Sequence, residues 1–210
     1  MKIGYFSIGK RATQELLINK SRFIGDVFHV VSEDEALENI QSIRDTYPDA
    51  THHCYAYYIG VDSIIKRFND DGEPSGTAGM PILQVIEQRE IENVLVVVTR
   101  YFGGIKLGAG GLVRAYSKTT AKTLDKAGRV WMELCDKGIL TIEYEYLGSV
   151  EYFLNQNNIP ILDTIYEDKV YIYVISPQPW DELVQRVNDI CNGTLIHKKL
   201  GQEYYPLAKE

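Results

Sequence analysis

The first 70 residues contain short apolar-rich runs bounded by polar breaks, a pattern typical of strands, with one stretch of helical spacing between them. Two pairs of runs, each joined by a short break, predict two β-hairpins: residues 15–18 with 22–28, and residues 53–59 with 63–68 through the link 60–62. Between the hairpins, Ser32 and Glu35 form a capping box ahead of apolar residues at helical spacing. A helix is therefore predicted to begin at Ser32 and to end before Pro48.

Two glycine-rich loops follow, on either side of the apolar run Val94–Val98. That run predicts a strand buried on both faces. The first loop, residues 70–79, is predicted to lead into a helix over about 77–89 capped by Thr77 or Ser75. The second loop, residues 101–111, is predicted to lead into a long helix that Gly128 ends. The predicted buried stripe of this helix consists of Val113, Tyr116, Thr120, Leu124 and Ala127.

The pattern restarts at Asp136. The following elements are predicted: a strand over 138–147, a helix capped by Ser149, strands over 161–166 and 170–175, a helix over 180–191 and a last strand over 194–203. Their order is β-α-β-β-α-β, that of a ferredoxin-like split unit. The sequence therefore predicts an α+β protein of two domains, residues 1–134 and 135–210, joined near residues 131–137.

Composition narrows the class of protein. No apolar run is long enough to span a bilayer, so we expect no membrane association. The three cysteines, Cys54, Cys135 and Cys191, are scattered and odd in number, which favours the reducing cytoplasm over a disulfide framework. The net charge of −7 argues against indiscriminate binding to nucleic acid.

The charge is unevenly distributed along the chain. Residues 1–135 hold 16 basic and 17 acidic side chains, a net charge of −1, whereas residues 136–210 hold 6 and 12, a net charge of −6. Between Thr99 and Val130 the only acid is Asp125, against seven basic residues. A local basic surface that attracts anionic partners is therefore expected on the first domain.

The second loop has the features of an anion site. Gly108, Gly110 and Gly111 open directly onto a helix, whose first amides lack partners, and Lys106 and Arg114 flank the turn. The spacing is not that of a Walker loop. Along the helix, Arg114, Lys118 and Lys122 lie at four-residue steps, and with Arg100 they suit phosphate-backbone contact. The alternatives are a simple tight turn and an ordinary solvated helix face.

The first loop is acidic, with Asp70, Asp71 and Glu73 near Ser75. Its spacing differs from that of a calcium loop, and we predict no bound metal or cofactor. The acids are expected to form a polar network with Arg100 or Arg114, or to cap backbone amides. His53 joins this cluster, but it faces away from Cys54 on a strand, and no second cluster completes a zinc site. A triad of His53 and Asp71 with Ser75 or Ser117 lacks the Gly-x-Ser-x-Gly context.

Five sequence blocks, in this order, resemble the signature blocks of the YigZ/IMPACT family: residues 20–23 (KSRF), 51–56 (THHCYA), 70–79 (DDGEPSGTAG), 99–108 (TRYFGGIKLG) and 111–116 (GLVRAY). The resemblance covers roughly residues 15–130, and the chain from about residue 138 is similar to the small second domain of bacterial members. It implies a first domain like domain IV of the translocating elongation factor, with the superfold of a ribosomal-protein domain, and a second domain like domain V of that factor. It implies no catalytic residues.

The resemblance also bears on function. Eukaryotic relatives are linked to control of translation initiation under amino-acid stress through an additional partner-binding domain, for which this chain has no room. Our leading hypothesis is a non-catalytic accessory factor of translation that binds RNA or ribosome phosphates. The residues expected to carry this binding are basic side chains and loop amides: Arg100, Lys106, Gly108, Gly110, Gly111, Arg114, Lys118 and Lys122.

A second hypothesis is a small-molecule enzyme or binder acting on a phosphorylated or carboxylated ligand. Here the two loops would form one pocket, with Asp71, Glu73 or His53 as acid or base. The discriminating feature is whether the loops converge on a concave pocket with a titratable group near the glycine amides. A third possibility, a protein-interaction module, predicts an apolar surface patch.

Overall fold

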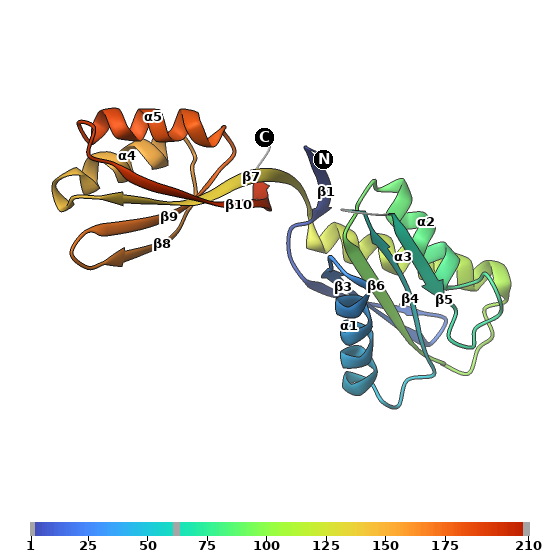
Figure 1. Cartoon of the computed structure of the whole chain (residues 1–210). Coiled ribbons are helices and arrows are strands. Elements are labelled where there is room, and N and C mark those ends of the chain that lie inside the picture. The colour runs from blue at the N-terminus through green and yellow to red at the C-terminus, as the bar shows by residue number, and fades with distance from the viewer. Residues whose placement is uncertain (1–2, 61–63, 208–210) are drawn as a thin grey trace. The chain divides into compact units, whose positions relative to one another are not determined.

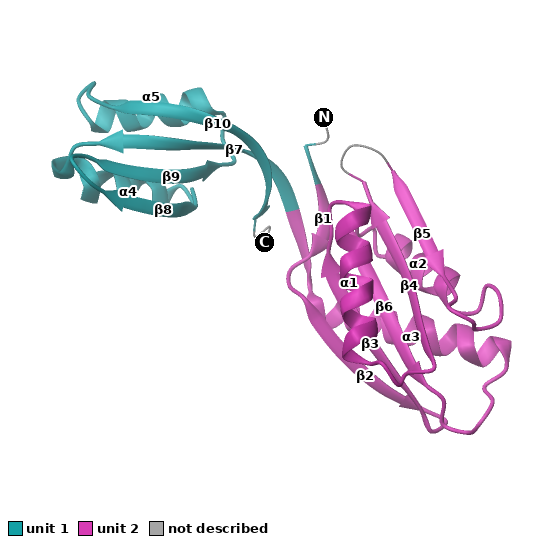
Figure 2. Ribbon diagram, turned by 60° about the horizontal axis from the view of Figure 1, so that its bottom comes forward, with its two compact units in different colours: residues 1–4, 132–207 teal, residues 5–131, 208–210 magenta. Residues whose placement is uncertain are grey.

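The computed structural model describes residues 3–60 and 64–207 of the chain. Their contacts divide them into two compact units (Figure 2). The N-terminal unit comprises residues 5–131, and the C-terminal unit comprises residues 3–4 and 132–207. No helix among the described residues is long and apolar enough to cross a membrane.

The N-terminal unit contains a five-stranded sheet with the strand order β2-β3-β6-β4-β5. Its strands are β2 (Ala12–Ile18), β3 (Ser21–His29), β4 (His52–Ile59), β5 (Ile65–Asn69) and β6 (Val94–Tyr101). Its helices are α1 (Glu33–Thr46), α2 (Gly79–Gln88) and α3 (Ala109–Ala127). All strand pairs in this sheet are antiparallel.

Helices cover both faces of this sheet (Figure 1). On one face, α2 and α3 pack against alternate residues of the central strands, including Val94, Val96 and Val98. On the other face, α1 packs against the intervening residues, including Leu95 and Val97. The prediction that Val94–Val98 is buried on both faces is therefore confirmed.

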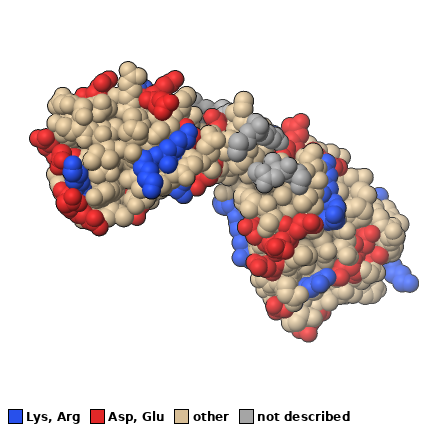
Figure 3. All heavy atoms as spheres, in the orientation of Figure 1, with Lys and Arg blue, Asp and Glu red and all other residues tan. Residues whose placement is uncertain are grey.

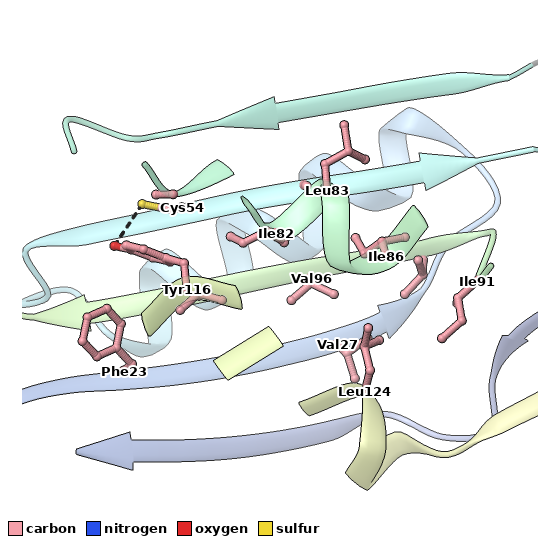
Figure 4. Packing of buried hydrophobic residues seen from close by; sticks show 14 of the residues in the cluster. Phe23, Val27, Cys54, Ile82, Leu83, Ile86, Ile91, Val96, Tyr116 and Leu124 are labelled. Carbon is pink, nitrogen blue, oxygen red and sulfur yellow. Dashed lines mark hydrogen bonds between the residues drawn. The ribbon is translucent and has the colours of Figure 1, made fainter. Parts of the chain in front are cut away.

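The core between the sheet and α3 contains polar atoms near one end (Figure 4). The Tyr116 ring of α3 packs edge-on against Phe23 of β3, with the ring centroids 5.3 Å apart. The Cys54 thiol of β4 lies 3.3 Å from the Tyr116 hydroxyl. Burial raises the pKa of both groups, so both hold their protons at neutral pH and can serve as donors.

Both predicted hairpins are present. β2 and β3 are joined by Asn19 and Lys20, whose φ angles of 46° and 64° are those of a tight two-residue turn. β4 and β5 also pair, although residues 61–63 of their link lie outside the described part. The first helix is capped as predicted, because the Ser32 hydroxyl accepts a hydrogen bond from the Glu35 amide. Glu35 in turn accepts from the Val31 amide rather than from Ser32.

The starts of the next two helices differ from prediction. α2 begins at Gly79, and neither Thr77 nor Ser75 caps it: the Thr77 hydroxyl donates to the Pro74 carbonyl, and Ser75 is exposed. The cap comes instead from Asp70, eight and nine residues upstream of the amides that it accepts from. α3 ends at Gly128 as predicted.

The buried stripe of α3 also needs one correction. Tyr116, Thr120, Leu124 and Ala127 are buried as predicted, whereas Val113 is only half-buried. Leu112 takes the place of Val113 in the core. Ala115, Thr119 and Thr123 are buried as well, so the buried face of α3 is wider than predicted and extends toward residue 112, which lies three and four residues before Ala115 and Tyr116.

The C-terminal unit has the predicted β-α-β-β-α-β order. After β1 (Gly4–Ile8), which pairs with β7, its elements are β7 (Arg129–Ile142), η1 (Tyr144–Tyr146), α4 (Leu147–Gln156), β8 (Ile161–Tyr166), β9 (Val170–Ser176), α5 (Trp180–Ile190) and β10 (Ile196–Leu207). This five-stranded sheet has the strand order β1-β7-β9-β8, and β10 also pairs with β7. Both helices pack on one face, against Leu140, Ile142, Val170, Ile172 and Val174.

Two predictions for this unit are wrong. The strand that begins the unit does not start at residue 138 or run to 147: β7 begins at Arg129 and ends at Ile142, so one continuous strand occupies residues 131–137. Ser149 does not cap the next helix, because α4 already begins at Leu147. Packing explains the difference, since Val150 and Leu154 are buried four residues apart and Leu147 also contacts this core.

Candidate anion-binding site

The N-terminus of α3 has no compensation for its positive end. Gly108, the N-cap, has a φ of 68°, and no side chain caps the helix. No acidic residue lies in the first turn. The first amides of α3 therefore have no intrahelical partner and carry partial positive charge toward the second glycine-rich loop.

The basic residues predicted on α3 are exposed. Arg114, Lys118 and Lys122 all lie on the solvent side, and none forms an ion pair within the part of the chain that the structure describes. Asp125, the acidic residue of this helix, instead forms an ion pair of 2.8 Å with Arg89, the residue that follows α2. On the face drawn in Figure 3, by comparison, acidic and basic side chains are interspersed over both units.

Two of these cations border a hollow of about 320 Å³ beside the turn of the β2–β3 hairpin. Its lining residues are Ile18, Asn19, Leu107, Gly111, Arg114, Ala115 and Lys118. We call this hollow and the neighbouring Lys122 the basic face of α3. Gly111 and Arg114, which the sequence predicts in one anion site, are thus brought together, and Gly110 lies exposed in the same first turn.

The two glycine-rich loops converge on a second cavity, of about 450 Å³. We call it the loop cavity. It is lined by Thr51, His52, Glu73, Pro74, Arg100, Phe102, Lys106, Leu107, Gly108, Ala109 and Leu112. Leu107 lines both this cavity and the hollow of the basic face, and it is the one residue that their linings share. The geometric condition for a pocket-type site is therefore met, because titratable groups and the start of α3 line the same concave surface.

The histidine in this cavity is His52 and not the predicted His53. Successive strand residues face opposite sides of the sheet, and His52 lies directly across from Arg100 of β6, which in turn lies across from Phe23 of β3. The His53 ring instead lies near Tyr47, with His53 Nε2 3.1 Å from the Tyr47 carbonyl oxygen. Burial lowers the pKa of His53, so it is neutral in the core at neutral pH.

His52 is held in one orientation. Its Nδ1 lies 2.8 Å from the Asp71 carbonyl, so Nδ1 carries the proton and donates it there. Nε2 is then the acceptor in the neutral ring, and it lies 3.9 Å from Glu73 Oε1. The sequence pattern contained a signal for His52, since the strand alternation that separates His53 from Cys54 places His52 on the same side as Cys54.

Glu73 is the centre of a buried network. Its Oε1 accepts from Arg100 Nη1 at 2.5 Å and from the Tyr116 hydroxyl at 2.8 Å. The Glu73 and Arg100 side chains are only 4% and 6% exposed. Arg100 is therefore not the surface contact that the sequence predicts, because its guanidinium is already committed to Glu73 on the wall of the cavity.

The other acids of the first loop have structural partners. Asp70 accepts from the amides of Gly76, Ala78 and Gly79, and so holds the loop against the start of α2. Asp71 accepts from the His53 amide and pairs with Arg44 at 3.2 Å. The expected polar network is therefore present, with Arg100 as one partner. Among the described residues, no group of three or more His, Cys, Asp or Glu side chains has a geometry suited to a metal ion.

Comparison with known proteins agrees with this division of the chain. The family described as "Impact N-terminal domain" matches residues 19–124, and the family described as "Domain of unknown function (DUF1949)" matches residues 140–194. A solved structure described as "Crystal structure of an hypothetical protein" is 32% identical, with a TM-score of 0.63, and the match covers 94% of this chain and 97% of that one.

Two curated bacterial proteins are similar over almost the whole length. "IMPACT family member YvyE" of Bacillus subtilis (strain 168) is 43% identical over 201 residues, which are 92% of this chain and 93% of that protein. "IMPACT family member YigZ" of Escherichia coli (strain K12) is 37% identical over 181 residues, which are 85% and 89% of the two chains. Both glycine-rich loops lie within the matched Impact N-terminal domain. The chain is a member of the YigZ/IMPACT family.

Proposed function

We propose that this protein is a cytoplasmic accessory factor of translation that binds RNA phosphates through the basic face of α3. The observation that carries the proposal is that Arg114, Lys118 and Lys122 are exposed, lie on one side of one helix and form no ion pair among the described residues. Exposed cations in a row on one helix can neutralise phosphates of a nucleic-acid backbone, and they gain affinity by releasing its counterions.

The energetics of α3 support the same proposal. Like charges four residues apart destabilise a helix by about 0.2–0.5 kcal/mol per pair. Arg114 also lies near the positive end of the helix dipole, which no acidic residue in the first turn offsets. An anion bound at this face would relieve both penalties. Such local conflicts are expected where function, rather than stability, selects the residues.

The translational part of the proposal comes from the family. Eukaryotic members of the IMPACT family are linked to the control of translation initiation. The C-terminal unit carries most of the net negative charge, with 12 acidic against 6 basic residues in 136–210. We assign it a positioning role or a contact with a basic ribosomal protein, since it repels RNA. Its proposed likeness to an elongation-factor domain agrees with such a role.

Six of the eight predicted contact residues divide into two groups in this proposal; the other two, Lys106 and Gly108, line the loop cavity. Arg114, Lys118 and Lys122 contact phosphates directly, with Gly110 and Gly111 allowing close approach to the α3 amides. Arg100 is a positioning residue, because its side chain anchors the first loop through Glu73.

The test is co-sedimentation of the full chain with ribosomes through sucrose at low and moderate salt. The double reversal Arg114→Glu with Lys118→Glu is expected to abolish salt-sensitive co-sedimentation. For binding to a purified RNA, it should reduce the slope of log affinity against log salt by about one unit per cation.

A matched control is Lys10→Glu with Lys198→Glu, which changes the net charge equally at two exposed lysines outside the basic face. This control is expected to sediment like the native protein. If the double reversal on α3 leaves affinity and salt slope unchanged, or if the control weakens binding as much, the basic face is not the contact surface.

A further inference from the structure

We propose that the loop cavity binds a small phosphate monoester of nucleotide size, with the phosphate at Lys106 and the first amides of α3, and a hydroxyl or amino group at His52 and Glu73. The cavity is a second site, whose lining shares only Leu107 with the hollow of the basic face. This inference does not depend on RNA binding by α3.

One end of the cavity is suited to an anion. Lys106 is exposed and forms no ion pair among the described residues, and Gly108 and Ala109 place the start of α3 on the same wall. Three orphan amides at a helix N-terminus and one ammonium group supply the donors that a phosphate requires. Gly108 has open space around the position of a Cβ, so no neighbouring atom of the described chain crowds the N-cap of α3.

The other end has the opposite character. The Glu73 carboxylate is buried there and its partner Arg100 is already engaged, so a second negatively charged group close to this carboxylate is disfavoured by like-charge repulsion. At the same end, the contact of His52 Nδ1 with the Asp71 carbonyl leaves Nε2 as the ring nitrogen that faces Glu73, and in the tautomer with the proton on Nδ1 it is an acceptor. Two acceptors side by side select a ligand group that donates hydrogen bonds, such as a hydroxyl or an amino group.

The walls between these ends are apolar. Pro74, Phe102, Leu107 and Leu112 line them, and the Phe102 ring is 48% exposed, which is high for a large apolar side chain. A volume of about 450 Å³ lies within the range of cavities that hold small ligands. A planar or apolar ligand centre between a phosphate and a donor group fits this arrangement of polar ends and apolar walls.

A buried polar atom on the wall also lacks a partner. Arg100 lines the cavity, its side chain is 6% exposed, and its Nε has no hydrogen-bond partner within the described part of the chain. Buried donors are almost always satisfied in folded proteins, so an unsatisfied one needs an explanation. This unsatisfied donor lies on a residue that lines the cavity, which singles out the Arg100 wall as the place to look for a bound ligand or an ordered water.

The experiment uses the full chain labelled with ¹⁵N and titrated with AMP, inorganic phosphate or adenosine. We expect AMP to shift the amide signals of Gly108, Ala109 and Gly110 and the ring signals of His52. Phosphate alone should shift the amides only, and more weakly. AMP at about 10 mM would detect even a dissociation constant in the millimolar range. If none of these signals moves at that concentration, the proposal is overturned.

Two variants test the two ends separately. Lys106→Ala, on an exposed loop, should lower the affinity for AMP and for phosphate by about tenfold or more, the effect of losing a charge-assisted hydrogen bond. His52→Asn keeps a donor for the Asp71 carbonyl but loses Nε2, and it should weaken AMP while leaving phosphate binding unchanged. An undisturbed spectrum of each variant without ligand shows that the fold is intact.

The control Lys118→Glu separates this site from the basic face. It should weaken RNA binding but leave AMP binding unchanged. If Lys118→Glu weakens AMP as much as Lys106→Ala does, the ligand lies on α3 and the loop cavity is not a site. A short RNA tests the source of the phosphate by competing with AMP for the cavity. If the RNA competes with a 5′-phosphate but not with a 5′-hydroxyl, the ligand is an RNA end. If neither form competes, the ligand is a free nucleotide.

Discussion

The carboxylate of Glu73, in the first glycine-rich loop, lies 2.5 Å from the guanidinium of Arg100, at the end of the central strand β6, and both side chains are buried. The contact fixes a loop, which has little regular structure of its own, to the most buried strand of the unit. It also joins the two sequence blocks that contain the acidic loop and the basic second loop. The ion pair is therefore the anchor of the loop cavity.

Removal of one partner should be costly. Glu73→Gln leaves the buried Arg100 charge uncompensated, and we expect a loss of about 3–5 kcal/mol in the stability of the N-terminal unit. Because the chain has two units, the measurement is urea-dependent amide hydrogen exchange of N-terminal segments rather than a single unfolding curve. The double variant Glu73→Gln with Arg100→Met removes both charges and should recover part of the loss. Equal stability of the single variant and the native chain would contradict this role.

Asp70 should contribute more to the stability of the N-terminal unit than an ordinary surface acid does. Asp70→Ala leaves the amides of Ala78 and Gly79 without their acceptor, and we expect a loss of about 1–3 kcal/mol. The exchange rates of these two amides should rise more than those at the C-terminal end of α2. Asp70→Asn, which keeps one oxygen acceptor, is the matched control and should lose less. Similar exchange in all three proteins would show that the cap is dispensable.

The glycines of the second loop should respond differently to the same substitution. A Cβ at Gly103 would lie 2.0 Å from the backbone carbonyl of Lys20, so Gly103→Ala must displace the hairpin turn and should cost about 1–3 kcal/mol. At Gly110, inside α3, a Cβ meets only Arg114 at 3.6 Å, and Gly110→Ala should be neutral or stabilise the helix by up to about 1 kcal/mol. Thermal denaturation of the pair checks the contrast. A stable Gly103→Ala protein would mean that the turn is free to move.

His53 should make the stability of the N-terminal unit depend on pH. Burial lowers the pKa of His53 in the folded state, so below the unfolded value of about 6.5 the unfolded chain binds the proton more readily. Stability should thus be complete above this pH and fall as the pH decreases toward 5, by at most about 1.4 kcal/mol per pH unit. His53→Gln, which does not titrate, should flatten this dependence. The check is hydrogen exchange, corrected for intrinsic rates, between pH 5 and 8; an equal slope in both proteins would contradict the prediction.

Much of the fold follows from local patterns. The capping box at Ser32, the apolar run Val94–Val98 and Gly128 each specify a boundary or a burial state through neighbouring residues alone, and the structure has them as predicted. The β-α-β-β-α-β order of the second unit is also present in the spacing of apolar positions. Helix and strand periods differ, so a sequence that keeps them consistent determines the elements and their order.

The sequence by itself therefore determined the elements, the family and the presence of two glycine-rich loops ahead of helices. Only the tertiary structure decided that Asp70 caps α2, that Arg100 is buried against Glu73, and that His52 rather than His53 faces the loop cavity. These facts depend on partners that are distant along the chain: Arg100 is 27 residues from Glu73, and it lies directly opposite His52 on the adjacent strand. Local pattern cannot encode such pairings, because strand register and packing bring these side chains together only in the folded sheet.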